Sequence, residues 1–245
     1  MSATKTLSTA WRILSQLRHD HRTLALIIFI PSILLTIFRF VFQNQQPVFQ
    51  AIAPQFLGIF PLIIMFIVTS VAMLRERRTG TLDRLMTMPI SKADLVLGYM
   101  LAFSLLALTQ VALACVVLLG FLDVPVAGST LQVVLAALIA AMLGTALGLF
   151  VSAFASSEFQ AVQFMPAFVL PQLLLCGLFA ARADMARPLQ WLANVLPMTY
   201  SVDAMKQVTL HTGWTSEFLQ DVAIVSVYVI GVLVLGALTI RRQEA

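Results

Sequence analysis

Long, nearly uncharged runs of apolar residues constrain this chain more than any other feature. Of its 245 residues, 60% are hydrophobic and only 11% are charged. A soluble domain carries about 25% charged residues, so this chain has too little polar surface to face water on all sides. The runs are continuous rather than alternating, which favours helices over β-strands. The sequence therefore predicts an all-α integral membrane protein with a single transmembrane domain over 1–245.

Six runs reach the length of about 20 mostly apolar residues that a membrane-spanning helix needs. They cover about 24–42, 56–74, 95–119, 130–154, 161–180 and 220–240. An even number of spans places both termini on the same side of the membrane.

The distribution of positive charge predicts which side that is. If the N-terminus is cytoplasmic, 11 of the 15 Lys and Arg residues lie inside and 4 lie at or beyond the outer face. This bias follows the positive-inside rule, and it indicates contact with anionic lipid rather than with nucleic acid. The inside residues are Lys5, Arg12, Arg18, Arg22, Arg75, Arg77, Arg78, Arg84, Lys92, Arg241 and Arg242, and the outside residues are Arg39, Arg182, Arg187 and Lys206.

Residues 1–23, before the first span, contain a basic amphipathic pattern over 5–19. At 100° per residue, apolar side chains share one arc and polar or basic ones take the other. The apolar arc holds Leu7, Ala10, Trp11, Ile13, Leu14 and Leu17. Such a helix is typical of the membrane interface, and we expect it at the inner face. An extension of the first span is the alternative.

A charged patch over 75–94 connects the second and third spans. It carries 4 of the 15 Lys and Arg residues within the eleven residues Arg75–Leu85. Gly80 can end the preceding helix, and Pro89 can end a new one. Between them, Leu82, Leu85 and Met86 recur at helical spacing, which predicts a two-turn cytoplasmic helix. On charge alone, a solvated anchor that only fixes topology is slightly favoured.

Two further segments flank the spans. Ser91 and Asp94 match a capping box that opens the third span. The loop 181–219 is too apolar to be free and too short to span, so we expect a half-inserted or surface-lying helix pair at the outer face.

Several kinds of chemistry have no residues to carry them in this sequence. No glycine is followed by lysine, so there is no phosphate-binding P-loop, and the three histidines lack metal-ligand spacing. No catalytic or metal site is expected. We place no Asp, Glu, Lys or His deep in a span, which argues against ion-coupled carriers. If the chain lines a path for an apolar molecule, its wall would include Phe38, Phe42, Phe56, Phe60 and Gln110, although interhelical bonding or packing is the simpler role for each.

At the charged patch the sequence resembles the membrane subunit of ABC-2-type ABC exporters. Members typically carry Glu-Arg-x-x-Gly-Thr-Leu-Glu-x-Leu, then Pro-Ile/Val and Ser. This chain has Glu76-Arg77-Arg78-Thr79-Gly80-Thr81-Leu82-Asp83-Arg84-Leu85 and then Pro89-Ile90-Ser91. A second motif matches at Pro171, Cys176-Gly177-Leu178-Phe179, Pro188, Pro197-Met198-Thr199-Tyr200 and Asp203-Ala204-Met205-Lys206, where Cys176 and Lys206 replace the usual Ser and Arg.

The resemblance implies a permease that performs no chemistry itself. Two permease subunits, alike or different, would pair in a bacterial plasma membrane and sit on two separate ATPase subunits, which bind the ATP and Mg. The helix near 81–88 would be the coupling helix, and export of a drug or lipid-like cargo would follow ATP hydrolysis. The implied coupling residues are Arg75, Glu76, Arg77, Gly80, Thr81, Leu82, Asp83, Leu85, Met86 and Pro89, and the external motif is Pro197, Thr199 and Tyr200. A membrane scaffold that docks a soluble protein is the alternative from another class, and a secondary carrier is a third.

Overall fold

The computed structural model describes residues 2–239, and every regular element among them is a helix, which confirms the all-α prediction. Arg241, Arg242 and the last residue of the predicted span 220–240 lie outside the described residues. The helices are α1 Ala3–His19, α2 His21–Val41, α3 Gln46–Arg78, α4 Thr81–Thr87, α5 Lys92–Cys115, η1 Val116–Phe121, α6 Thr130–Val151, η2 Ser152–Phe154, α7 Glu158–Leu175, η3 Arg182–Asp184, α8 Arg187–Val195, α9 Pro197–Leu210 and α10 Ser216–Thr239.

Among the described residues, five helices are long and apolar enough to cross a membrane: α2, α3, α5 with η1, α6 and α10. The other predicted span is α7, which has 18 residues and ends five residues before the predicted end at 180. Its sequence includes Glu158, Pro166, Pro171 and three glutamines, so it is less apolar than the rest. The count of six spans stays a prediction.

Helix α3 is longer than the sequence indicated. The predicted external loop 43–55 is mostly part of this helix, which begins at Gln46 and has 33 residues. Pro47 lies in its first turn, where the missing N–H costs no hydrogen bond. At 1.5 Å per residue α3 is about 50 Å long, whereas the hydrocarbon core is about 30 Å thick. The helix therefore extends beyond the membrane, and its basic end Arg75–Arg78 reaches water.

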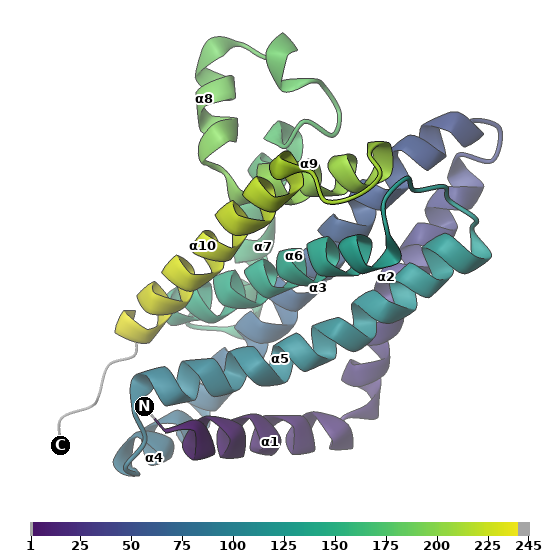
Figure 1. Ribbon diagram of the computed structural model, residues 1–245. Helices are drawn as coiled ribbons and strands as arrows, with labels where there is room; N and C mark the ends of the chain where they lie inside the picture. Colours follow the sequence, from purple (N-terminus) through teal and green to yellow (C-terminus); the bar gives the residue numbers. More distant parts are fainter. Residues whose placement is uncertain (1, 240–245) are drawn as a thin grey trace.

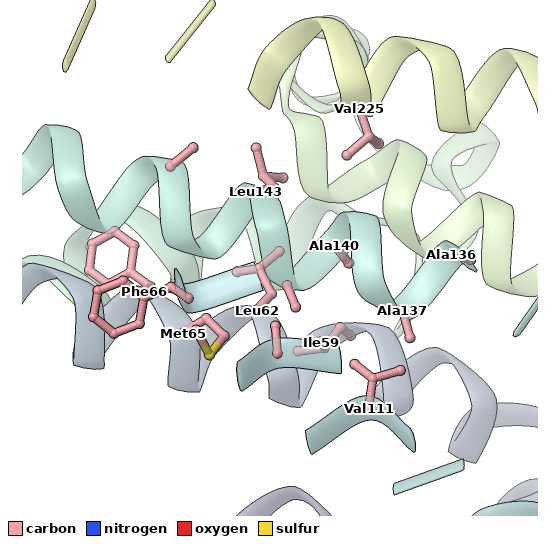
Figure 2. Packing of buried hydrophobic residues seen from close by; sticks show 14 of the residues in the cluster. Ile59, Leu62, Met65, Phe66, Val111, Ala136, Ala137, Ala140, Leu143 and Val225 are labelled. Carbon is pink, nitrogen blue, oxygen red and sulfur yellow. The ribbon is translucent and has the colours of Figure 1, made fainter. Parts of the chain in front are cut away.

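Helices α3 and α6 form the centre of the bundle, and α2 and α10 lie at its edge. In the most apolar stretch of each helix, 61% of α3 and of α6 is buried, against 22% of α2 and 17% of α10. Figure 2 shows Leu62, Met65 and Phe66 of α3 packed beside Ala140 and Leu143 of α6. The exposed apolar faces of α2 and α10 are thus free for lipid or for another subunit.

Two glycines allow α3 and α6 to touch through their backbones. A Cβ added at Gly144 would lie 2.1 Å from the Leu62 carbonyl oxygen, and one at Gly148 would lie 2.0 Å from Thr69 Oγ1. Thr69 Oγ1 also donates to the Thr145 carbonyl oxygen at 3.3 Å. Small residues that bring backbones together, with a polar contact beside them, are what hold helices together in lipid.

The two ends of the bundle carry different shorter helices. At one end α1 lies across the bundle beside α4 and the start of α5, and α10 also ends on this side (Figure 1). At the opposite end α8 projects from the bundle, with α9 beneath it (Figure 1). As expected, α1 and α4 share one end and the shorter helices of 181–219 lie at the other. We call these the inner and outer ends after the charge bias, and which end faces the cytoplasm stays a prediction.

We expect Gly144→Ala to lower the free energy of unfolding by about 1–3 kcal/mol, because the new methyl group must displace backbone. Gly231→Ala is the matched control, since a Cβ there meets nothing within 4 Å. Thermal unfolding of the two variants in one detergent checks this. Equal midpoints for both variants would contradict the close crossing of α3 and α6.

Candidate functional site

The connection between α3 and α5 is a short helix with fixed boundaries. Helix α3 stops at Arg78, and Gly80 has a φ of 70°, a left-handed conformation that favours glycine. Helix α4 follows directly and has 7 residues. The Ser91 side chain accepts from the Asp94 backbone N–H, and Asp94 accepts in return from the Ser91 backbone, which completes the capping box at the start of α5. The predicted short helix and capping box are both confirmed, and the cytoplasmic location of the helix stays a prediction.

The apolar face of α4 turns toward the chain's own helices. Leu82 is only 6% exposed, and Leu85 and Met86 pack against the buried core. The chain's own core therefore covers part of this face, and Leu85 and Met86 remain partly exposed. That this face also meets a soluble partner stays a prediction. From Thr79 to Ser91, the exposed residues are Thr79, Asp83, Arg84, Thr87, Met88 and Pro89.

Helix α1 is seated on the start of α5. A Cβ added at Gly98 would lie 2.6 Å from Thr9 Cβ, so the two helices approach as closely as glycine allows. The Ser2 backbone N–H donates to Asp94 Oδ1 at 2.9 Å, and Lys5 Nζ donates to the Pro89 carbonyl oxygen. The first turn of α1 is thus tied both to the capping box of α5 and to the end of the α4 loop.

The apolar arc predicted for α1 divides between two surroundings. Ala10 and Ile13 are 3% exposed and face the protein, whereas Leu7 is 58% and Trp11 74% exposed. An exposed Trp and Leu on a basic helix are typical of a helix lying in a membrane interface. Helix α1 is separated from α2 by the single residue Asp20, which accepts from the Thr23 backbone at 3.1 Å as the N-cap of α2.

One ion pair joins α1 to the charged patch. Arg12 Nη1 donates to Glu76 Oε1 at 2.9 Å, and Arg12 Nη2 donates to the Tyr99 hydroxyl at 3.0 Å. The Glu76 side chain is only 12% exposed, so it is occupied inside the protein. Its neighbour Arg75 forms a two-point ion pair with Glu158 of α7, at 2.8 and 3.0 Å. The patch thus holds α1, α3, α5 and α7 together at one end.

The external motif, Pro197, Thr199 and Tyr200, caps the C-terminal end of helix α8. The last carbonyl groups of a helix lack partners within the helix, and here three hydroxyl groups supply them. Thr199 donates to the Ala193 carbonyl at 2.7 Å, Tyr200 to that of Asn194 at 2.6 Å, and Tyr228 of α10 to that of Val195 at 2.6 Å. Pro197 begins α9 directly afterwards. In the described residues this motif joins the end of α8 to α9, and any further role stays a prediction.

The second half of that motif anchors η3 and α7 to α9. Arg182 Nη2 donates to Asp203 Oδ2 at 2.6 Å, and Lys206 Nζ donates to the Gly177 carbonyl at 2.7 Å. Burial raises the pKa of Asp203, although Arg182 and Lys206 oppose this effect. Lys206, which differs from the usual Arg of the motif, therefore still has a polar partner.

Of the side chains predicted to line a substrate path, the four phenylalanines form a cluster between α2 and α3, and Gln110 is buried in α5. The Phe38 ring of α2 packs at a tilt against the Phe56 ring of α3, with 4.5 Å between ring centroids, and Phe42 and Phe60 adjoin this pair. Gln110 is fully buried, and within residues 2–239 its amide has no hydrogen-bond partner. The structure joins the four rings in one cluster, and their role in a path stays a prediction.

Sequence reasoning missed several residues of the inner end: Arg12, Gly98, Tyr99 and Glu158. Each is unremarkable in its own segment and gains its partner only when helices far apart in sequence meet. The polar arc of α1 was one usable signal, because Arg12 lies on it opposite the apolar residues.

Comparisons with known proteins agree on one family. A family model described as "ABC-2 type transporter" matches residues 4–210. The chain is 29% identical over 143 residues to ABC transporter G family member 20 of Dictyostelium discoideum, covering 58% of this chain and 20% of that protein. Two Escherichia coli K12 proteins are each 27% identical: Probable multidrug ABC transporter permease YbhR, over 65% of this chain and 43% of the relative, and inner membrane transport permease YhhJ, over 62% and 40%. The chain spans less than half the length of these relatives.

We expect Arg12→Ala to loosen α1, because Glu76 loses its charged partner and an unpaired buried carboxylate costs about 1–3 kcal/mol. Amide hydrogen exchange of residues 3–19 should become about tenfold faster. Arg18→Ala is the matched control, since it removes the same charge from an exposed position of the same helix. Equal exchange rates in the two variants would show that the ion pair does not hold α1.

Proposed function

This chain belongs to the ABC-2 type transporter family, and from this premise we propose that it is the permease of an ATP-driven exporter. It is a transmembrane subunit of an ABC transporter, with several helices apolar enough to cross the membrane. The proposal adds three things: a separate ATPase bound at the α1–α4 end, outward movement of the cargo, and a hydrophobic or amphipathic cargo. The observation that carries it is the short helix α4, fixed between two long spans and tied to α1.

The contacts at the inner end support a mechanical role for α4. Its apolar face packs on its own chain, so a force on its exposed face, Asp83, Arg84 and Thr87, passes into α3 and α5 rather than moving α4 alone. Helix α1 must follow, because Ser2 and Lys5 are bonded to the same loop and helix start. When the ATPases close on ATP, a tilt of these helices would open the path outward.

The cargo and the surroundings are proposed from weaker support. The relative YbhR is named as a probable multidrug permease, and the phenylalanine cluster of α2 and α3 offers an apolar wall. The relative YhhJ is named as an inner membrane transport permease, which supports a bacterial inner membrane. Cytoplasmic termini are proposed from the bias of Lys and Arg residues. The exposed apolar faces of α2 and α10 leave room for a second permease subunit and for lipid.

A membrane scaffold that docks a soluble protein without transport is the alternative. Both functions use the exposed face of α4, so binding alone does not separate them. The permease should copurify with an ATPase that carries a P-loop, and a transported hydrophobic compound should stimulate ATP hydrolysis in reconstituted vesicles. Copurification without any stimulation by a panel of hydrophobic compounds would favour the scaffold.

We expect a charge reversal at the exposed face, Asp83→Arg with Arg84→Glu, to weaken coupling while the permease still folds. Cargo-stimulated ATP hydrolysis should fall at least severalfold, because like charges would now face each other at the contact. The matched control is Asp184→Arg at the opposite end, which is also exposed. Full stimulation in the double variant would contradict the assignment of α4 as the coupling helix.

Leu85→Asp should act differently from the surface variant. Since Leu85 is partly buried against the core, a carboxylate there would lose part of its hydration without gaining a partner and would destabilise the fold. The expected result is a lower yield of folded protein in detergent, measured by size-exclusion chromatography. A well-folded Leu85→Asp protein that lacks only coupling would support the interpretation that this face meets the partner.

A further inference from the structure

A crevice of about 540 Å³ opens at the inner end between α1, α3 and α5. This volume lies within the range of roughly 300–1,000 Å³ that small-molecule sites occupy. Along α3 it extends from Ile67 to Thr79, which is about 18 Å at the rise of a helix. Half of the hydrocarbon core is about 15 Å, so the crevice runs from the cytoplasmic surface to near the middle of the membrane.

The crevice is apolar at its depth and polar at its mouth. Its inner wall is formed by Ile67, Val68, Val71 and Phe103, with Ile13 and Leu17 of α1 along one side. The mouth is bordered by Gln16, Asp20 and Thr23 on one side and by Arg75, Glu76 and Thr79 on the other. This order of surfaces matches a molecule with one alkyl chain and one polar head.

The charged residues at the mouth favour a ligand with a positively charged head group. The Arg75 guanidinium already donates to both carboxylate oxygens of Glu158, and the Arg12 guanidinium already donates to Glu76 and Tyr99. Asp20, by contrast, forms no ion pair within residues 2–239: Thr23 donates two hydrogen bonds to its carboxylate, and Arg75 acts on it only through space. These hydrogen bonds lower the pKa of the Asp20 carboxyl, so it stays charged. Glu76 Oε2 is buried and has no partner in the described part of the chain.

We propose that this crevice binds a cationic amphiphile from the inner leaflet, with its ammonium group at Asp20 and its alkyl chain between α1, α3 and α5. The crevice lies between α1, α3 and α5, and α4, the proposed docking site of the ATPase, connects α3 to α5. A tilt of α3 against α5 would therefore change its shape. The assignment of the bound molecule as cargo rests on the proposed function, whereas the binding itself does not.

The test uses the full chain, together with any ATPase that copurifies with it, in nanodiscs of phosphatidylcholine. Three probes with the same alkyl chain and different head groups distinguish the contribution of the head group to binding from that of the chain: hexadecyltrimethylammonium, hexadecyl sulfate and hexadecanol. The unmodified protein should bind the ammonium probe more tightly than the other two. Asp20→Asn should weaken ammonium binding about fivefold and leave hexadecanol unchanged, since asparagine remains a good helix N-cap. Asp184→Asn, at the opposite end, is the matched control.

A second variant tests the depth of the site. Val71→Trp fills the crevice and should weaken the ammonium probe and hexadecanol alike, and its thermal unfolding shows whether the fold persists. If the Val71→Trp protein unfolds, the proposal is tested by the ammonium affinity of Asp20→Asn alone. Equal ammonium affinity in Asp20→Asn and the unmodified protein, or sulfate bound as tightly as ammonium, would overturn the proposal. Binding is measured without ATP, so a protein that binds the ammonium probe but has no associated ATPase would contradict only the proposed function.

Discussion

Helices surrounded by lipid gain little by hiding apolar side chains from one another, so close backbone contact must hold them together. In this chain that contact is the crossing of α3 and α6 at Gly144 and Gly148, where an added Cβ would meet backbone or Thr69 within 2.1 Å. The crossing fixes α3, and α3 extends past the membrane to present the charged patch. The ion pairs of the charged patch with α1 and α7 depend on the position of this one helix.

The inner end then becomes a single unit through polar contacts between distant segments. Glu76 of α3 binds Arg12 of α1, Asp94 of α5 binds the first turn of α1, and Glu158 of α7 binds Arg75. The apolar face of α4 packs against its own chain, with Leu82 buried and Leu85 and Met86 partly buried. A partner that presses on α4 therefore acts on several helices together, which suits a subunit that converts the motion of an ATPase into the opening of a path.

Local patterns predicted much of this fold. The apolar runs located the long helices, Gly80 and Pro89 bounded α4, and Ser91 with Asp94 marked the start of α5. The errors came from long-range packing. The periodicity of Leu82, Leu85 and Met86 showed that α4 has an apolar face but not which neighbour covers it, and α3 continued through 46–55 because tertiary contacts favoured helix over a loop. Arg12 could not be paired with Glu76 and Tyr99 before the helices were placed.

The central claim is that α1, α4 and the start of α5 move as one body when the ATPase closes. Spin labels on exposed positions, Ser8 of α1 and Thr87 of α4, would report the distance between them with and without ATP. A third label at Asp184, at the opposite end, gives the reference. The account predicts that the distance between 8 and 87 stays constant while the distance between 87 and 184 changes. A change between 8 and 87 of the same size would contradict it.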